Sequence, residues 1–288
     1  MNIESIVKRI EDNYMAEEFD AAKVASFPSR SEVIKIIKEL RALLFPGYFD
    51  YRFPIKENQS YFIGNLINEI RDLLFEQVKA AFLFAGENDA EVKADEVCDI
   101  FFEELPNVHN LLLKDVQAAF DGDPAAQSKP EIIFSYPGLF AIFIYRVAHV
   151  LYEQKVPLIP RLMTEYGHSG TGVDINAGAK IGEYFFMDHA TGIVIGETTE
   201  IGNHVKLYQG VTLGALSTKD GQALSGVKRH PTICDNVVIY SNASVLGGDT
   251  VIGENAVIGG SAFITSSVPA NTTVAVKNPE HVIHGPRT

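Results

Sequence analysis

The chain has 288 residues, of which 46% are hydrophobic and 21% are charged, a composition typical of globular proteins. Acidic residues number 37 against 24 basic ones, which gives a net charge of −13. Such a surface repels phosphate groups, so the composition excludes general binding to nucleic acid or to an anionic membrane. Two cysteines, Cys98 and Cys234, are too few for a disulfide framework. Because the N-terminus also lacks the apolar core of a signal peptide, the sequence predicts a cytoplasmic protein.

The first 165 residues are expected to form an α-helical domain. Ser29 and Glu32 match a capping box, in which the serine side chain binds a free amide at the start of a helix. Apolar residues then recur at spacings of three and four through residues 33–44 and 63–78, which predicts two amphipathic helices. Further helices are predicted over residues 91–105, 107–120 and 138–154.

Residues 166–288 follow a different period. They hold 18 of the 23 glycines, and aliphatic residues recur mostly every six positions from Ile175 to Ile264. A helix requires a period of 3.6 and an ordinary strand a period of 2, so a period of six indicates hexapeptide repeats. Three hexapeptides, each with one short strand and one inward aliphatic residue, make one coil of a parallel β-helix. A C-terminal tail is expected to follow the last coil. The period lapses between Leu213 and Ile233, where a polar, glycine-rich segment is either a functional loop or a tolerated surface insertion.

The eight histidines are candidate metal ligands. All eight lie after residue 108, yet the nearest pairs within the coils are fifteen or more residues apart, and there is no Cys-x-x-Cys or His-x-x-x-His pair. The sequence therefore predicts no metal site.

A second possibility for His189 is general base catalysis. Asp174 lies fifteen residues earlier, close to one coil back, so stacking could bring its carboxylate near the imidazole. A carboxylate on one ring nitrogen fixes the tautomer and raises the basicity of the other nitrogen. The alternative is that His189 is a corner residue whose hydrogen bonds are satisfied.

Four strings of residues carry a resemblance to a known family. They are the run from Thr171 to Ala215, which contains VDI and DHATG, the downstream KRHPTI, and the upstream YRVAHVLYEQ with GDPAA. Together they strongly resemble the serine O-acetyltransferases, which are left-handed parallel β-helix enzymes of cysteine biosynthesis. The resemblance implies an α+β fold, a helical N-terminal domain followed by the β-helix, and acetyl-CoA as co-substrate.

The resemblance also implies roles for the residues that match the motifs. His189 of DHATG is expected to be the general base and Asp174 of VDI its partner. The amino-acid substrate is expected to bind to Asp123, Asp188, Arg229 and His230. A serine zwitterion requires carboxylates for its ammonium and an arginine for its carboxylate, which suits these residue types. Candidate residues for binding coenzyme A are Gly214, Ala215, Ser241, Gly260 and Lys277.

The chain departs from the family at several points. Asn176 and Ala177 replace a common His-Pro pair, and the segment over residues 215–228 is longer than in many relatives. Near the end of the chain, residues 277–280 differ from the string that lines the coenzyme site in the family. The last residue is Thr288, whereas members that bind O-acetylserine sulfhydrylase do so through a C-terminal isoleucine, so this complex is doubtful for the present chain.

The leading hypothesis is transfer of the acetyl group from acetyl-CoA to the L-serine hydroxyl. L-cysteine is expected to act as a feedback inhibitor, and the family assembles as a homotrimer or a dimer of trimers with active sites between neighbouring chains. One alternative keeps the acyl donor but uses another amino acid or a sugar hydroxyl as acceptor. A second alternative is a non-catalytic solenoid that serves assembly.

Overall fold

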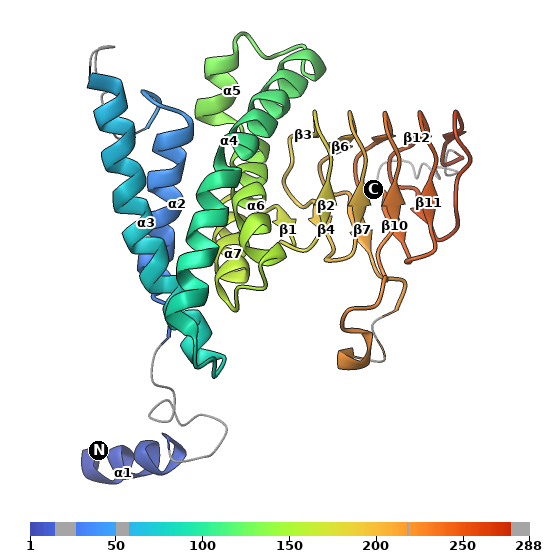
Figure 1. Ribbon diagram of the computed structural model, residues 1–288. Helices are drawn as coiled ribbons and strands as arrows, with labels where there is room; N and C mark the ends of the chain where they lie inside the picture. Colours follow the sequence, from blue (N-terminus) through green and yellow to red (C-terminus); the bar gives the residue numbers. More distant parts are fainter. Residues whose placement is uncertain (15–26, 50–57, 218, 220, 278–288) are drawn as a thin grey trace, which may run out of the picture. The chain divides into compact units, whose positions relative to one another are not determined.

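The computed structural model describes residues 1–14, 27–49, 58–217, 219 and 221–277. In these residues a helical N-terminal region is followed by a parallel β-solenoid (Figure 1). The predicted fold class is confirmed in these two parts. Packing divides the chain into two compact units, one of residues 1–104 and 151–162 and the other of residues 105–150 and 163–288. The predicted boundary at residue 165 falls within a helix and stays a prediction.

The predicted helix start at Ser29 is confirmed, because its side chain accepts a hydrogen bond from the Glu32 amide. Helix α2 (Arg30–Leu44) buries the apolar face that the spacing predicts. Helix α3 (Gln59–Phe84) buries most of its predicted face, but Ile63 at the start of that face is exposed. The two helices predicted over residues 91–105 and 107–120 are one helix, α4, that continues through Pro106. Proline removes one backbone donor and clashes with the carbonyl four residues earlier, which favours a break, yet α4 continues on both sides of Pro106. The seven helices in the described residues are α1 (Ile3–Tyr14), α2 (Arg30–Leu44), α3 (Gln59–Phe84), α4 (Ala90–Gly122), α5 (Lys129–Ser135), α6 (Pro137–Glu153) and α7 (Ile159–Thr171).

The strands of the solenoid form three parallel sheets. Sheet A contains β1 (Asp174–Ile175), β4 (Val194–Ile195), β7 (Thr212–Gly214), β10 (Ser244–Leu246) and β13 (Phe263–Ile264). Sheet B contains β2 (Lys180–Ile181), β5 (Glu200–Ile201), β8 (Thr232–Ile233) and β11 (Val251–Ile252). Sheet C contains β3 (Phe186–Asp188), β6 (Lys206–Tyr208), β9 (Val238–Ile239), β12 (Val257–Ile258) and β14 (Thr273–Val274). Up to β13, successive strands pass from A to B to C, so these coils have an A–B, a B–C and a C–A corner. After β13 the next strand, β14, belongs to sheet C.

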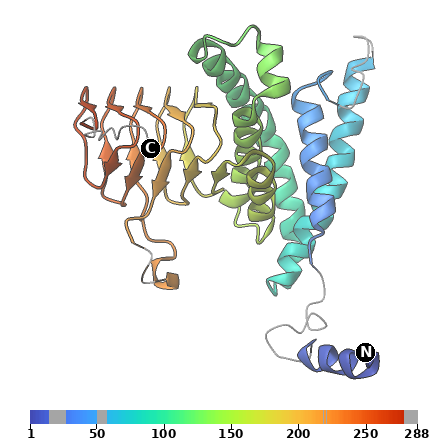
Figure 2. The same cartoon turned by 180° about the vertical axis from the view of Figure 1, so that it is seen from behind.

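The six-residue period corresponds to the register of these sheets. Ile175 is the register partner of Ile195, which in turn pairs with Leu213 in the next coil. These three side chains are at most 3% exposed, so each coil adds one aliphatic layer to a continuous core. The segment between β7 and β8 leaves the stack and carries the short 3-10 helix Gly221–Leu224 (Figures 1 and 2).

Residues of α4 and α6 cover the first edge of the solenoid within the second unit. Arg146 of α6 forms a buried two-point ion pair with Asp115 of α4 and also donates to the Gly182 carbonyl at 2.8 Å. Tyr145 donates to the Ala179 carbonyl at 2.6 Å. The first coil therefore has helix side chains where later coils have a neighbouring strand.

Candidate active site

The C–A corner of the first coil is longer than its equivalents and carries His189. The inward residues Met187 and Ile195 are eight positions apart, whereas the equivalent residues of later coils are six apart. His189 and Ala190 both have left-handed backbone conformations, with φ of 57° and 64°. Such φ values are uncommon for residues other than glycine, but other corners of the solenoid share them, at His204 and Asn236 for example, so they mark the turn of the chain. The corner projects the His189 side chain into solvent, where it is 75% exposed.

Two predicted carboxylates lie beside this histidine. Oδ1 of Asp188 lies 3.9 Å from Nε2 of His189, and Oδ2 lies 3.2 Å from Nζ of Lys206. Asp123 follows the end of α4 and accepts hydrogen bonds from the Tyr136 hydroxyl at 2.6 Å and from the Ala125 amide at 2.8 Å. The Tyr136 hydrogen bond, followed by the Ala125 amide, lowers the pKa of Asp123. The site therefore presents two carboxyl groups near an exposed imidazole, and the lowered pKa keeps Asp123 ionised at neutral pH.

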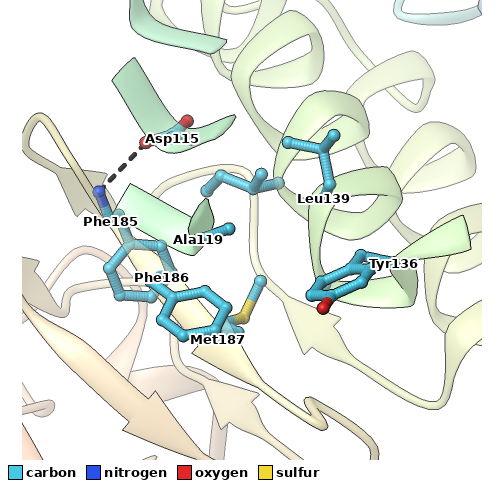
Figure 3. A pocket seen from close by; sticks show the side chains of 9 residues that line it. Asp115, Ala119, Tyr136, Leu139, Phe185, Phe186 and Met187 are labelled. Atoms are coloured by element: carbon cyan, nitrogen blue, oxygen red, sulfur yellow. Dashed lines mark hydrogen bonds between the residues drawn. The ribbon is translucent and has the colours of Figure 1, made fainter. Parts of the chain in front are cut away.

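A small cavity of about 10 Å³ lies behind this site, against β3 (Figure 3). In Figure 3, Phe186 and Met187 of β3 face Ala119 and Leu139 across it, with Tyr136 beside them. One water molecule is the most that such a volume can hold. The cavity is therefore a small packing gap beside the strand, and it is too small to hold an amino acid.

The predicted partnership between Asp174 and His189 is not seen within the single chain. The Asp174 amide donates to the Ile193 carbonyl, which fixes the backbone of β1 beside that of β4. In the part of the chain that the structure describes, no hydrogen bond or ion pair joins the Asp174 carboxylate to His189. The assignment of Asp174 stays a prediction.

Arg229 and His230 lie at a different corner, the A–B corner before β8. One guanidinium nitrogen of Arg229 lies 2.5 Å from a carboxylate oxygen of Glu197, and the other donates to the Leu224 carbonyl at 3.2 Å. The Thr198 amide donates to Nδ1 of His230 at 3.1 Å. Because an amide can only donate, Nδ1 carries no proton and the neutral ring carries its hydrogen on Nε2. Burial, with a smaller effect of Arg229, lowers the pKa of His230 to about 4.

The predicted residues thus form two groups at two corners of the solenoid. Asp123, Asp188 and His189 gather at the C–A corner. Arg229 and His230 gather at the A–B corner, with the whole of sheet A between the two corners. One chain alone does not bring the two groups together.

The candidate coenzyme residues divide in the same way. Ser241 and Gly260 lie in neighbouring coils just after sheet C, and a Cβ at Gly260 would lie 3.2 Å from the Ser241 carbonyl oxygen. Gly214 ends β7 beside Leu246, and Ala215 follows it toward the A–B corner. Lys277 is exposed at the end of the described residues. Thr288 and the rest of residues 278–288 lie outside them.

Four site residues are absent from the sequence-based prediction. They are Tyr136 and Lys206 at the C–A corner and Glu197 and Thr198 at the A–B corner. The solenoid register could have predicted Lys206, since it lies twenty residues after Phe186, which is one coil further along and directly beside it. Nothing in the sequence predicts Tyr136 at this site, because its position depends on how the chain bends between α5 and α6.

The described residues contain neither a metal-ligand cluster nor a single membrane-spanning helix. No group of three or more His, Cys, Asp or Glu side chains there could hold a metal ion. Within the same residues, no single helix has the length and apolarity to cross a membrane, although α5 and α6, bent by 74°, pass that test as a pair.

Hexapeptide coils, a helical region and a polar corner bearing a histidine define this chain as an acyltransferase of the hexapeptide-repeat class. No protein-family model matches the chain. The serine acetyltransferase "plasmid" of Synechococcus elongatus is 44% identical over 232 residues, which are 76% of this chain and 73% of the relative. The serine acetyltransferase of Bacillus licheniformis is 49% identical over 137 residues, 48% of this chain and 61% of the relative. The chain belongs to the serine acetyltransferase family.

Solved structures agree with this assignment. Serine acetyltransferase 1 of Entamoeba histolytica, in complex with L-cysteine, is 38% identical with a TM-score of 0.75, over 83% of this chain and 86% of that one. The Neisseria gonorrhoeae serine acetyltransferase, in complex with serine, is 26% identical with a TM-score of 0.57, over 84% and 95% of the two chains.

Proposed function

We propose that this protein transfers the acetyl group of acetyl-CoA to the hydroxyl of L-serine, giving O-acetylserine for cysteine biosynthesis. The observation that carries the proposal is the C–A corner, where Asp123 and Asp188 lie around an exposed His189 in a chain of this family. Complexes of relatives with serine and with L-cysteine support an amino acid as the ligand.

In this reaction His189 is the general base. It takes the hydroxyl proton while the serine oxygen attacks the carbonyl carbon of the thioester. The tetrahedral intermediate then collapses, the carbon–sulfur bond breaks, and the thiolate leaves and takes a proton from the His189 imidazolium. The products are O-acetylserine and coenzyme A, and no metal takes part. A positioned base contributes about 10²–10⁴-fold to the rate, and alignment of the two substrates contributes more.

Substrate recognition follows from charge. Asp123 and Asp188 bind the ammonium of serine, and Arg229 binds its carboxylate. His230, neutral and with its hydrogen on Nε2, donates one further hydrogen bond. Asp174 orients His189. Acetyl-CoA lies along Gly214, Ala215, Ser241, Gly260 and Lys277.

The two corners meet between chains. The protein forms a homotrimer, alone or as a dimer of trimers, in which His189 of one chain faces Arg229 of the next. The separation of the two groups by sheet A supports this arrangement, since the carboxylates proposed for the serine ammonium lie at one corner and the guanidinium proposed for its carboxylate lies at the other. Sedimentation checks the assembly, and a stable, active monomer would contradict it.

Regulation and compartment complete the proposal. L-cysteine carries the same ammonium and carboxylate as serine, so it competes for the same site and acts as a feedback inhibitor. Inhibition that added serine cannot relieve would contradict a shared site. The two free cysteines, Cys98 and Cys234, support a reducing compartment, the cytoplasm.

The deciding experiment is thiol release from acetyl-CoA with L-serine, homoserine and amino sugars as acceptors. The proposal expects the highest kcat/KM with L-serine. A preference for another acceptor would move the assignment to a different acetyltransferase. The absence of turnover with all acceptors would favour an assembly role.

A further inference from the structure

Lys206 makes three kinds of contact at the C–A corner. It lies on β6, and its Nζ donates a hydrogen bond of 2.7 Å to the carbonyl of Gly122, the last residue of α4. The same nitrogen lies 3.2 Å from Oδ2 of Asp188 on β3. It also lies over the rings of Phe186 and Tyr208, 4.9 and 4.6 Å from their centres. One ammonium therefore connects the end of a helix to two neighbouring coils.

This ammonium carries its charge at neutral pH. The Lys206 side chain is only 19% exposed, and burial lowers its pKa. Interactions with Tyr208 and Asp188 outweigh burial, and the net direction of the pKa shift is upward. A largely buried charge is stable only when it is paired, and the carbonyl, the carboxylate and the two rings supply that pairing.

Resting on the proposed function, we propose that Lys206 is a positioning residue for the substrate ammonium, which acts through the two carboxylates that bind it. Asp123 is the residue next to Gly122, so the bond to the Gly122 carbonyl holds the backbone that presents Asp123. The contact with Oδ2 holds Asp188 and leaves Oδ1 toward His189. Lys206 thus fixes the separation of the two carboxylates.

The same lysine sets the charge of the site. Asp123 and Asp188 without a counter-charge amount to −2, and the Lys206 ammonium reduces this to −1. A single negative charge matches a single substrate ammonium, so neither carboxylate is left unpaired when serine binds. Specificity for an ammonium therefore depends on a residue that need not touch the substrate.

The chain contains a matched control in Lys114. Its Nζ lies 2.6 Å from an oxygen of Glu183 and 5.9 Å from the centre of the Tyr184 ring. Like Lys206 it connects α4 to the first coil, and its side chain is 24% exposed. Its partners, however, lie at the B–C corner, away from His189. A merely structural role predicts that the two lysines behave alike.

The experiment compares Lys206→Met, Lys206→Arg and Lys114→Met in steady-state turnover, with thermal unfolding as a check on folding. Lys206→Met is expected to raise KM for L-serine about tenfold, because a carboxylate that is no longer held in place loses its charge-assisted hydrogen bond to the substrate ammonium. Its kcat and its KM for acetyl-CoA are expected to stay within about twofold of the wild type. Lys206→Arg, which keeps the charge, recovers most of the serine KM, and Lys114→Met leaves it unchanged.

Two results would overturn the inference. One is an equal serine KM in Lys206→Met and Lys114→Met. The other is a lower serine KM in Lys206→Met, which would mean that the lysine competes with substrate for the carboxylates. Should Lys206→Met not fold, Lys206→Gln, which keeps a donor for the Gly122 carbonyl, is held to the same expectation. Wild-type turnover is measured first, because its absence would overturn the proposed function, whereas turnover without a serine effect overturns only the role of Lys206.

Discussion

At the scale of single residues, His189 combines a strained backbone with an exposed side chain. We expect His189→Asn to lower kcat by about 10²–10⁴-fold, because it removes the base. Asparagine tolerates a left-handed φ, so the midpoint of thermal unfolding is expected to stay within about 2 °C of the wild type. Thiol release measures kcat, and thermal melts measure the midpoint of unfolding. Near-normal turnover would remove His189 from the mechanism, and Asp174→Asn is expected to do less damage.

His230 gives a prediction about stability and pH. Its pKa is about 4 in the folded chain, against an ordinary value of 6.5. As pH falls from 6.5 toward 4, the unfolded chain therefore binds a proton that the folded chain does not. The free energy of unfolding then falls by up to about 1.4 kcal/mol per pH unit from this group, with no such effect above the ordinary value.

We therefore expect His230→Asn to flatten the pH dependence of unfolding in that window. Urea titrations across it measure the slope. His204→Asn is a matched control, because asparagine occupies the same corner position in the following coils, at Asn236 and Asn255. Equal slopes in the wild type and in His230→Asn would show that His230 titrates normally in the folded protein.

The sequence predicts the local part of the site better than the distant part. Asp188 and His189 are neighbours in the chain, so the motif that contains one contains the other. Tyr136 and Lys206 reach the same corner from a helix and from the next coil. Such contacts depend on packing between elements, which spacing along one element does not record.

At the scale of elements, close approach explains why some glycines cannot be replaced. A Cβ at Gly196 would lie 2.1 Å from the His230 ring, whereas a Cβ at Gly64 in α3 has nothing within 4 Å. We expect Gly196→Ala to destabilise the protein by about 1–3 kcal/mol through overpacking. Gly64→Ala is expected to stabilise it by about 1 kcal/mol through helix propensity. Thermal melts of the two variants measure the direction of each change in stability. An unchanged stability in Gly196→Ala would show that the corner accommodates a Cβ without cost.

The ion pair of Arg146 and Asp115 gives the second prediction about elements. Its side chains are at most 3% exposed, so Arg146→Met leaves a buried carboxylate without its partner. We expect a loss of about 3–5 kcal/mol in the free energy of unfolding. Arg71 also binds two carboxylates, Asp95 and Asp99, but near the surface, so Arg71→Met is expected to cost at most about 1 kcal/mol. Equal losses in urea titrations would contradict the distinction.

The elements also show where periodicity stops being informative. A period of six predicts the strands, because every inward residue must repeat at the same position of each coil. The continuous α4 could not be predicted from its apolar spacing, since Pro106 is as compatible with a break as with a tolerated missing donor.

At the scale of the whole molecule, the proposed trimer requires each active site to take His189 from one chain and Arg229 from the next. A chain with His189→Asn and a chain with Arg229→Ala are then both inactive alone. In a mixed trimer, one junction joins an intact His189 to an intact Arg229. The defects can therefore complement each other only if the site lies between chains.

We expect activity to return when the two variants are unfolded together and refolded as a mixture. With random assembly, three quarters of the trimers are mixed and each has one working site in three, which is about a quarter of wild-type activity. A mixture of His189→Asn with Asp123→Ala is the control, because both changes fall on the same side of the junction and no intact site can form. Recovery in neither mixture would place all of these residues in one chain's own site, and recovery in both would mean that the assumed partition between the corners is wrong.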